Sequence, residues 1–293
     1  MGGTKNKYLR LILCYVLWGF QPLYWALLGD YDPFTILGVR IIFSAIFAVL
    51  LLALGHRLHE LWALFRDRAT MKLLIPATVF IFADWAVYIA AVSAGRVLDV
   101  SLGYYINPLV LFLIGAVIYR ERATAASLVA LAIAAAGVVV STLAYGSFPA
   151  LALVIALNWA VYAALKKNVR VDGVLSIAVE TILMTPPALI FLLAFRTPEL
   201  GAASPTDALL LIGSGVVTAL PMFLYSDCVS KLPLTVMCFA QYLSPTFGLL
   251  CGCLLGEVFT KSQLMSLAFF VAAIIVFSCG ELRAARQSAG GTE

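Results

Sequence analysis

Ten apolar stretches, each long enough to cross a lipid bilayer as a helix, constrain this chain more than any other feature. A spanning helix needs roughly 20 apolar residues to cross roughly 30 Å of hydrocarbon. The stretches cover residues 8–28, 34–54, 72–94, 98–118, 124–143, 148–166, 174–195, 207–229, 234–255 and 263–281. The links between them are short, so we expect an all-α integral membrane protein with ten transmembrane helices and no separate soluble domain.

The composition excludes a soluble globular domain. Hydrophobic residues make up 63% of the 293 residues and charged residues only 12%, which is more apolar surface than a soluble core can bury. The longest link, 55–71, alternates leucine and aromatic residues with charges, and it is typical of an amphipathic helix at the membrane surface. The first stretch contains Trp18, Gln21 and Pro22 without a small-residue cleavage site, so it is not a signal peptide.

The distribution of lysine and arginine predicts the orientation. With the N-terminus in the cytoplasm, 15 of the 19 basic residues fall on the cytoplasmic side, three fall on the other side, and Arg40 lies inside a span. Basic residues gather on the cytoplasmic side of membrane proteins. We therefore expect both termini in the cytoplasm of a bacterial cell, with the chain in the inner (plasma) membrane. The net charge of +4 requires no nucleic-acid partner.

A Tyr-x-x-Pro module followed by a glutamate occurs once in each half of the chain. The first module occupies residues 105–108 and precedes Glu121; the second occupies residues 242–245 and precedes Glu257. The modules lie on the fourth and ninth stretches. Five crossings separate them, an odd number, so the copies have opposite orientations. This predicts two inverted five-helix repeats, residues 1–145 and 146–293, with a central site where they meet.

The modules contain candidate hinges and candidate helix caps. Pro108 and Pro245, like Pro22 in the first stretch, each remove a backbone hydrogen bond inside a span and predict a kink. The kinks either form hinges beside a binding site or merely shape the bundle. Glu121 and Glu257 each lie at a span terminus close to the next helix, where a carboxylate can cap exposed amides.

Charged side chains inside the spans are candidates for function, because a charge in the membrane must be paired or hydrated. Asp84, near the middle of its span, is a candidate for proton coupling or for countering a cationic solute. Arg40 is a candidate for holding a carboxylate or phosphate, and Glu180 is a second proton-coupling candidate. The alternative is that these charges form structural pairs, such as Arg40 with Asp84 or Glu180. Asp227 lies near a span end, where it can simply be interfacial.

Aromatic and amide side chains at similar depth complete the candidate substrate site. Stacked rings beside a carboxylate suit an organic cation or an amphipathic, amino-acid-like solute, although any single ring can instead serve packing or the lipid interface. With the charged residues Asp84, Arg40 and Glu180, the candidate substrate-binding set comprises Trp18, Gln21, Trp85, Tyr88, Tyr105, Asn107, Asn158, Tyr162, Gln241 and Tyr242.

Several segments resemble the RarD proteins, a family in the EamA-type branch of the drug/metabolite transporter superfamily. The resemblance covers nearly the whole chain. It is carried by residues 15–25 (YVLWGFQPLYW), Arg40, residues 101–109 (SLGYYINPL), residues 179–181 (VET), and residues 232–234 and 241–245 (LPL and QYLSP). It implies ten helices in two inverted repeats, cytoplasmic termini and transport of small metabolites. Asp84 stands where the family usually has asparagine, and Asp227 is also a departure.

The sequence favours a secondary transporter over an enzyme or a pump. The two histidines, His56 and His59, lie in a predicted cytoplasmic loop, so no histidine cluster lies at membrane depth, and the chain has no Walker-type glycine loop for ATP. We expect uniport, exchange or proton coupling by alternating access, with no cofactor or metal. The alternative is a lipid scramblase or a non-transporting membrane scaffold. Expected partners are a small-molecule substrate and membrane lipids, with the protein a monomer or homodimer.

Overall fold

The computed structural model describes residues 2–94, 96–146, 148–256 and 260–290, and these residues form helices and turns without a strand. Two short helices lie in the links between the predicted stretches: α3 (Leu58–Arg66) and α9 (Thr197–Gly201). The others are α1 (Gly2–Ala26), α2 (Pro33–Leu54), α4 (Arg68–Ser93), α5 (Val97–Leu113), α6 (Ala125–Tyr145), α7 (Ala150–Lys167), α8 (Gly173–Phe195), α10 (Pro205–Val229), α11 (Leu234–Gln241), α12 (Leu243–Leu254) and α13 (Lys261–Gly290).

Nine segments among the described residues are long and apolar enough to cross a membrane. They correspond to nine of the ten predicted stretches, with α11 and α12 together forming one of them. The first stretch is also helical, as α1, but Arg10, Gln21 and Pro22 interrupt its apolar run and it is not one of the nine. The predicted surface helix in the 55–71 link is α3, with buried Leu61 and Leu64 and exposed Trp62.

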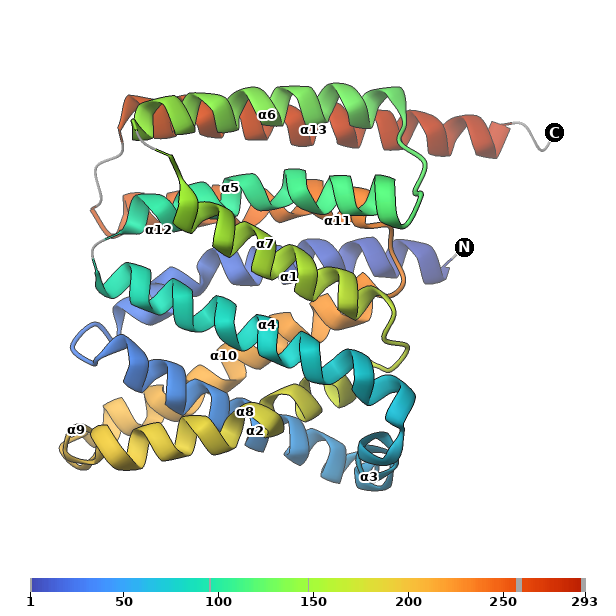
Figure 1. Ribbon diagram of the computed structural model, residues 1–293. Coiled ribbons are helices and arrows are strands. Elements are labelled where there is room, and N and C mark those ends of the chain that lie inside the picture. The colour runs from blue at the N-terminus through green and yellow to red at the C-terminus, as the bar shows by residue number, and fades with distance from the viewer. Residues whose placement is uncertain (1, 95, 147, 257–259, 291–293) are drawn as a thin grey trace.

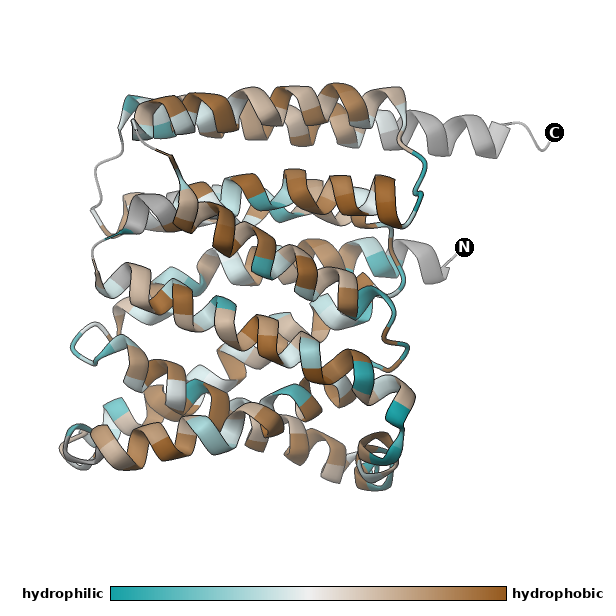
Figure 2. Cartoon of the chain, in the orientation of Figure 1, coloured by the Kyte–Doolittle hydropathy of each residue, from teal (hydrophilic) through white to brown (hydrophobic). Residues whose placement is uncertain are grey.

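The two chain ends lie at the same end of the helix bundle (Figure 1). The helix α3 and the links α5–α6, α7–α8 and α10–α11 lie at this end as well. We call it the basic end, because these segments contain most of the lysine and arginine residues. The opposite end, which contains α9 and the α1–α2 link, is called the far end. Hydrophilic residues gather in the links and helix ends, whereas the helix bodies are mostly hydrophobic (Figure 2).

Capping residues fix where several of these helices begin and end. Asp32, Thr124 and Asp172 accept hydrogen bonds from the first-turn amides of α2, α6 and α8, respectively. Ser204 forms a reciprocal capping box at the start of α10. Gly146 ends α6 in a left-handed conformation with φ of 77°, which glycine adopts without steric strain. Short polar links therefore separate long apolar helices.

The helices pack in two layers that do not coincide with the two halves of the sequence. In the first layer, α6, α5, α7, α4 and α8 pack on one another in that order; in the second, the order is α13, α11–α12, α1, α10 and α2. Helices α1 and α2 of the first half thus lie in the second layer, and α7 and α8 of the second half lie in the first layer. Each half of the chain contributes helices to both layers.

Exchanging the two halves reproduces the pattern of helix contacts. The exchange pairs α1 with α7, α2 with α8, α4 with α10, α5 with α11–α12, and α6 with α13. The contact of α5 with α7 corresponds to that of α12 with α1, and the contact of α4 with α7 corresponds to that of α10 with α1. Between the layers, α6 packs on α13, α5 on α11, and α2 on α8. The duplicated sequence thus forms equivalent packing twice.

Candidate functional site

Arg40 of α2 reaches from the second layer to the first. Its guanidinium lies 4.7 Å from the ring centroid of Trp85 on α4 and 5.6 Å from that of Trp25 on α1. Cation–π contacts of this length are attractive, most strongly where water is excluded. The Nε atom is buried without a hydrogen-bond partner. Within the described residues, Arg40 forms no ion pair with a carboxylate, so the expected alternative of pairing with Asp84 or Glu180 is absent there.

Asp84 lies on α4 immediately before Trp85, and its side chain is only 1% exposed. Its Oδ1 atom is buried without a hydrogen-bond partner. Tyr104 of α5 lies within electrostatic reach of both Asp84 and Arg40, and its ring centroid is 6.1 Å from that of Tyr88. A guanidinium, a carboxyl group and several rings therefore lie in the far half of the bundle. We call Trp25, Arg40, Asp84, Trp85, Tyr88 and Tyr104 the charged aromatic site.

A second group of rings lies on the basic-end side of this site. We call Tyr15 and Trp18 of α1, Trp159 and Tyr162 of α7, and Tyr225 of α10 the central aromatic cluster. The Trp18 ring centroid is 5.4 Å from that of Trp159 and 5.5 Å from that of Tyr225. The helices α1 and α7 do not themselves pack closely in the described structure. Aromatic side chains therefore fill the middle of the bundle between the layers.

Glu180 forms a buried ion pair with Lys166, and both side chains are 1% exposed. Lys166 also donates to Ser176, and Glu180 accepts a 3.0 Å hydrogen bond from the Tyr162 hydroxyl. Lys166 is one of the 15 basic residues assigned to the cytoplasmic side, but its side chain is buried rather than exposed to solvent. The spacing of Trp159, Tyr162 and Lys166, i, i+3 and i+7, places all three on one helix face and was the signal for its burial.

The two Tyr-x-x-Pro modules meet at the α5–α11 contact. The Tyr242 hydroxyl donates a 3.2 Å hydrogen bond to the carbonyl oxygen of Tyr105. Both rings pack on Phe270 of α13, at centroid distances of 4.5 Å for Tyr105 and 4.7 Å for Tyr242. Both tyrosines are buried, with exposures of 6% and 1%. The module tyrosines, predicted to bind substrate, therefore join the two layers.

The amide side chains of the candidate set have different surroundings. Gln21 donates a 2.8 Å hydrogen bond to the Val217 carbonyl, and Asn107 donates a 2.8 Å bond to the Ala156 carbonyl. The Gln21 bond joins α1 to α10 in the second layer, and the Asn107 bond joins α5 to α7 in the first layer. Gln241 is buried and its Oε1 atom has no partner, whereas Asn158 is half-buried on α7. Gln21 and Asn107 thus connect neighbouring helices.

The three candidate kink prolines have unequal effects on the backbone. Pro22 lies inside α1 and Pro108 inside α5, and neither ends its helix. Helix α5 continues into a π-helical stretch at Ile114–Ile118. At the second module, the helix is interrupted at Tyr242, between α11 and α12, and Pro245 lies in the first turn of α12. The duplicated motif therefore interrupts its helix only in the second copy.

Glu121 caps a helix of the opposite layer. Its carboxylate accepts hydrogen bonds of 2.9 Å from the backbone amides of Leu234 and Thr235 and one of 3.0 Å from the Thr235 hydroxyl. Lys167 lies 3.5 Å from the same carboxylate. Glu121 thus has the helix-capping role predicted from the sequence, but it caps α11; the adjacent helix α6 is capped by Thr124. The other expected cap, Glu257, lies outside the described residues.

Replacing Glu121 by alanine should destabilise the protein by about 1–2 kcal/mol, because two amides at the start of α11 lose their acceptor. Hydrogen exchange of the Leu234 and Thr235 amides should accelerate, and the melting temperature should fall. The matched control is Arg122→Ala, which alters an exposed neighbour and should leave both measurements unchanged. Equal effects of the two substitutions would contradict the capping role.

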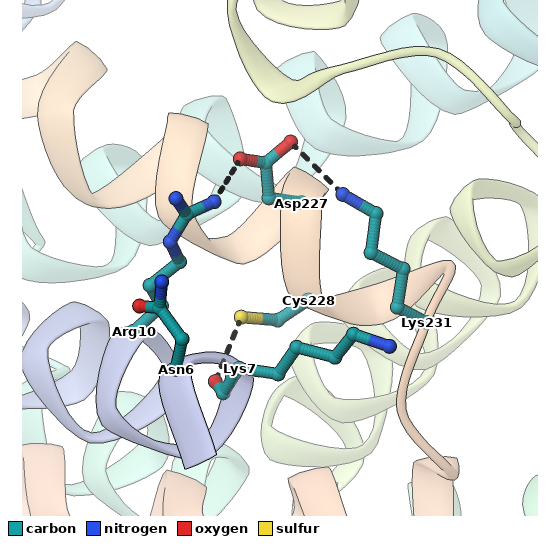
Figure 3. Close-up of a pocket in the computed structure, with 6 residues that line it drawn as sticks. All are labelled: Asn6, Lys7, Arg10, Asp227, Cys228 and Lys231. Atoms are coloured by element: carbon teal, nitrogen blue, oxygen red, sulfur yellow. Dashed lines mark hydrogen bonds and ion pairs between the residues drawn. The ribbon is translucent and has the colours of Figure 1, made fainter. Parts of the chain in front are cut away.

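Two crevices open at the basic end. One has a volume of about 350 Å³ and is lined by Asn6, Lys7, Arg10, Asp227, Cys228 and Lys231 (Figure 3). In it, Asp227 lies 3.2 Å from Arg10 and 3.8 Å from Lys231. The other measures about 600 Å³ and is lined by Tyr119, Lys167, Asn168, Arg170, Val171, Asp172, Ser230 and Lys231. Neither crevice is lined by a residue of the charged aromatic site. Asp227 is held by its ion pairs with Arg10 and Lys231.

The described residues contain no group of three or more His, Cys, Asp or Glu side chains that could hold a metal ion. The charged aromatic site combines three kinds of group that can contact a small molecule. A guanidinium can hold a carboxylate or phosphate, a carboxylate can hold an ammonium group, and rings can enclose the organic part.

Known proteins are similar to this chain in sequence and in fold. Residues 6–143 and 148–279 each match the model of the EamA-like transporter family. The transporter YojE of Bacillus subtilis is 35% identical over 97% of this chain and 97% of its own length. The RarD protein of Escherichia coli is 31% identical, with 94% of each chain covered. A crystal structure with a TM-score of 0.74 and 16% identity covers 94% of this chain and 98% of its own; this similarity concerns the fold alone.

Proposed function

Because this chain belongs to the EamA-like transporter family, we propose that it is a secondary transporter that moves a small polar or amphipathic organic solute by alternating access. The charged aromatic site is the proposed binding site. The observation that carries the proposal is the position of two side chains near the same rings: the buried carboxyl group of Asp84 and the guanidinium of Arg40. Among the described residues, neither group is paired with an opposite charge. Unpaired buried charges are unfavourable unless a ligand or water compensates them.

The site suits a solute that carries both charges. An anionic group would pair with Arg40, an ammonium group would pair with Asp84, and the organic part would pack on Trp85 and Tyr88. The rings already contact one another or Arg40, so they are positioned before a solute arrives. Preorganised side chains reduce the entropy lost on binding.

The inverted-repeat architecture is part of the proposal. Ten spans, including α1, would place the five helices of residues 1–145 and the five of residues 146–293 in opposite orientations. Support comes from the contact pattern, which is reproduced when the halves are exchanged, and from the two family matches. Alternating access would then be a movement of the two layers against each other, with each layer containing helices from both halves.

The proposed location is the bacterial inner membrane, with both termini in the cytoplasm. Support comes from the basic end, where both termini and most of the lysine and arginine residues lie (Figure 1). At this end, polar contacts join the layers: Glu121 caps α11, and Lys167 donates to the carbonyl oxygen of Leu232. The central aromatic cluster lies between this end and the charged aromatic site.

A thermal-shift screen of the purified protein tests the binding site. Three sets of solutes of equal size are compared: organic anions, organic cations and zwitterions. A ligand present at 100 times its Kd stabilises the folded protein by about 2.7 kcal/mol. We expect zwitterions to raise the melting temperature most, and the hits are then tested for uptake in proteoliposomes. Lipid movement without solute uptake would contradict the transporter proposal.

A further inference from the structure

The antiparallel helices α2 and α8 begin in the same way at opposite ends of the bundle. Asp32 caps α2 at the far end, where it accepts a 2.8 Å hydrogen bond from the amide of Phe34. Asp172 caps α8 at the basic end, where it accepts bonds of 3.1 and 3.2 Å from the amides of Val174 and Leu175. The helices pack against each other and are equivalent when the halves are exchanged.

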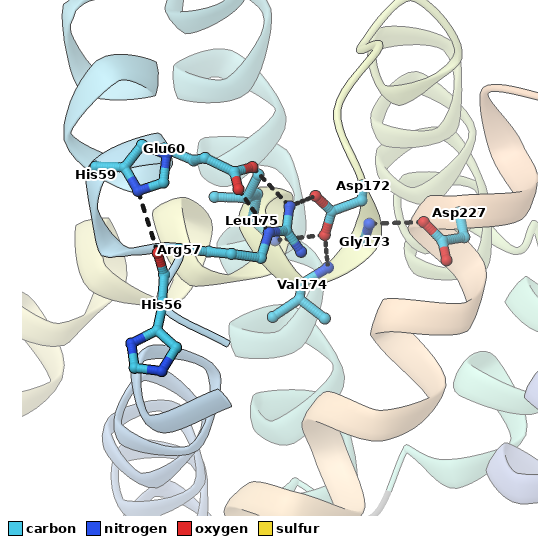
Figure 4. A network of polar contacts seen from close by, with 9 residues as sticks. All are labelled: His56, Arg57, His59, Glu60, Asp172, Gly173, Val174, Leu175 and Asp227. Atoms are coloured by element: carbon cyan, nitrogen blue, oxygen red, sulfur yellow. Dashed lines mark hydrogen bonds and ion pairs between the residues drawn. The ribbon is translucent and has the colours of Figure 1, made fainter. Parts of the chain in front are cut away.

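Each capping aspartate also pairs with an arginine that lies just beyond the end of the opposite helix. At the basic end, Asp172 pairs with Arg57, which follows α2 (Figure 4). At the far end, Asp32 lies 3.0 Å from Arg196, which follows α8. We call these pairs the basic-end clasp (Arg57–Asp172) and the far-end clasp (Asp32–Arg196). The same Asp–Arg arrangement therefore occurs at both ends of one helix pair.

We propose that the two clasps are the locks of the two gates of the transporter, one parting when the protein opens toward the basic end and the other when it opens toward the far end. The inference rests on the proposed function. Helix α2 belongs to one layer and α8 to the other. Any gap that opens between the layers along this edge must separate α2 from α8 at that end, and the clasp is the charged contact found there.

The exposure of the clasps suits pairs that part and re-form. The side chains are 36% and 34% exposed in the basic-end clasp and 30% and 32% exposed in the far-end clasp. Water can therefore solvate the four charges as soon as each pair separates. The Lys166–Glu180 pair is 1% exposed at both side chains and joins α7 to α8 within one layer. The exposed pairs bridge the two layers, and the buried pair strengthens one of them.

Each clasp has a second carboxylate beside it. Glu60 holds Arg57 with hydrogen bonds of 2.8 and 2.7 Å, and this contact keeps the pKa of Glu60 below its ordinary value. Arg57 therefore keeps an anionic partner when Asp172 departs. At the far end, Glu199 binds the backbone of α2, accepting a 2.8 Å bond from the amide of Asp32. Parting of the basic-end clasp should thus be the easier of the two movements.

The test compares hydrogen–deuterium exchange of purified full-length variants without any solute. Asp172→Asn and Arg57→Gln each remove the basic-end clasp, and Asp32→Asn and Arg196→Gln each remove the far-end clasp. Asparagine caps helices as well as aspartate does, so the Asn variants lose the ion pair and keep the cap. If one variant does not fold, the other variant of the same clasp provides the measurement. Arg66→Gln, at an exposed position of α3 outside both clasps, is the control.

The expected result is a change of opposite sign at the two ends. Both basic-end variants should raise the amide exchange rate of residues 173–176 by about two- to fivefold and lower that of residues 34–36. Both far-end variants should do the reverse. A rise confined to the altered end, or no change at either end, would overturn the gate proposal. Since no solute is present, these outcomes are independent of whether the thermal-shift screen finds a ligand.

Discussion

Replacing Lys166 by methionine is expected to destabilise the protein by about 3–5 kcal/mol. The substitution removes the cation that compensates Glu180, and both side chains are 1% exposed. An uncompensated carboxylate at such a position is strongly unfavourable, because water cannot reach it. The measurement is the thermal melting of the purified protein in detergent, compared with the unaltered chain.

The double variant Lys166→Met with Glu180→Gln should recover most of the lost stability. Glutamine keeps an acceptor for the hydroxyls of Tyr162 and Ser176, which contact Glu180, and neither substituted side chain carries a charge. Replacing a buried ion pair as a unit is often neutral. The surface control is Lys231→Met, whose pair with Asp227 is exposed; it should change stability by less than about 1 kcal/mol. A double variant no more stable than Lys166→Met would contradict this assignment.

Replacing Arg40 by glutamine should weaken the binding of a zwitterionic or anionic solute by roughly 30- to 100-fold. The loss corresponds to about 2–3 kcal/mol for a hydrogen-bonded charge pair. Replacing Asp84 by asparagine should weaken the zwitterion similarly but leave an anionic solute almost unaffected. The measurements are Kd values from the concentration dependence of the thermal shift, followed by uptake into proteoliposomes.

The matched control for these two substitutions is Arg122→Gln, at an exposed position in the α5–α6 link outside the charged aromatic site. It should leave both affinities within about threefold of the unaltered chain, since such a change in Kd is only about 0.6 kcal/mol. Normal binding and uptake by both Arg40→Gln and Asp84→Asn, in well-folded protein, would rule out the charged aromatic site as the place of recognition.

The helices could be predicted from the sequence because length and apolar character are properties of each segment alone. The predicted stretches 34–54 and 174–195 differ from α2 and α8 by one residue at their first positions and match at their last. The duplication was visible in residues 105–108 and 242–245, which share spacing and composition. A bilayer imposes one simple requirement on every span, so local patterns are sufficient for this level of description.

The partners of polar side chains could be predicted less well. Glu121 was expected to cap a helix, but the helix that it caps is α11, more than 110 residues later in the chain. Glu180 was expected to face Arg40 or a solute and is paired with Lys166. In both cases the sequence did not reveal the partner of the carboxylate, because helix packing determines which helix faces meet.

The sequence by itself determined a membrane protein of apolar helices with duplicated halves, basic residues concentrated on one side, and charges at membrane depth. Only the tertiary structure decided that each layer combines helices from both halves. It also decided that the Arg40 guanidinium lies over the Trp85 ring, whereas Glu180 pairs with Lys166. Finally, it decided that the capping aspartates at both ends of the α2–α8 pair form ion pairs with arginines of the opposite helix ends. The length and apolar character of a segment determine whether it becomes a spanning helix. Long-range packing fixes the neighbours, and a charged side chain depends on its neighbours for its role.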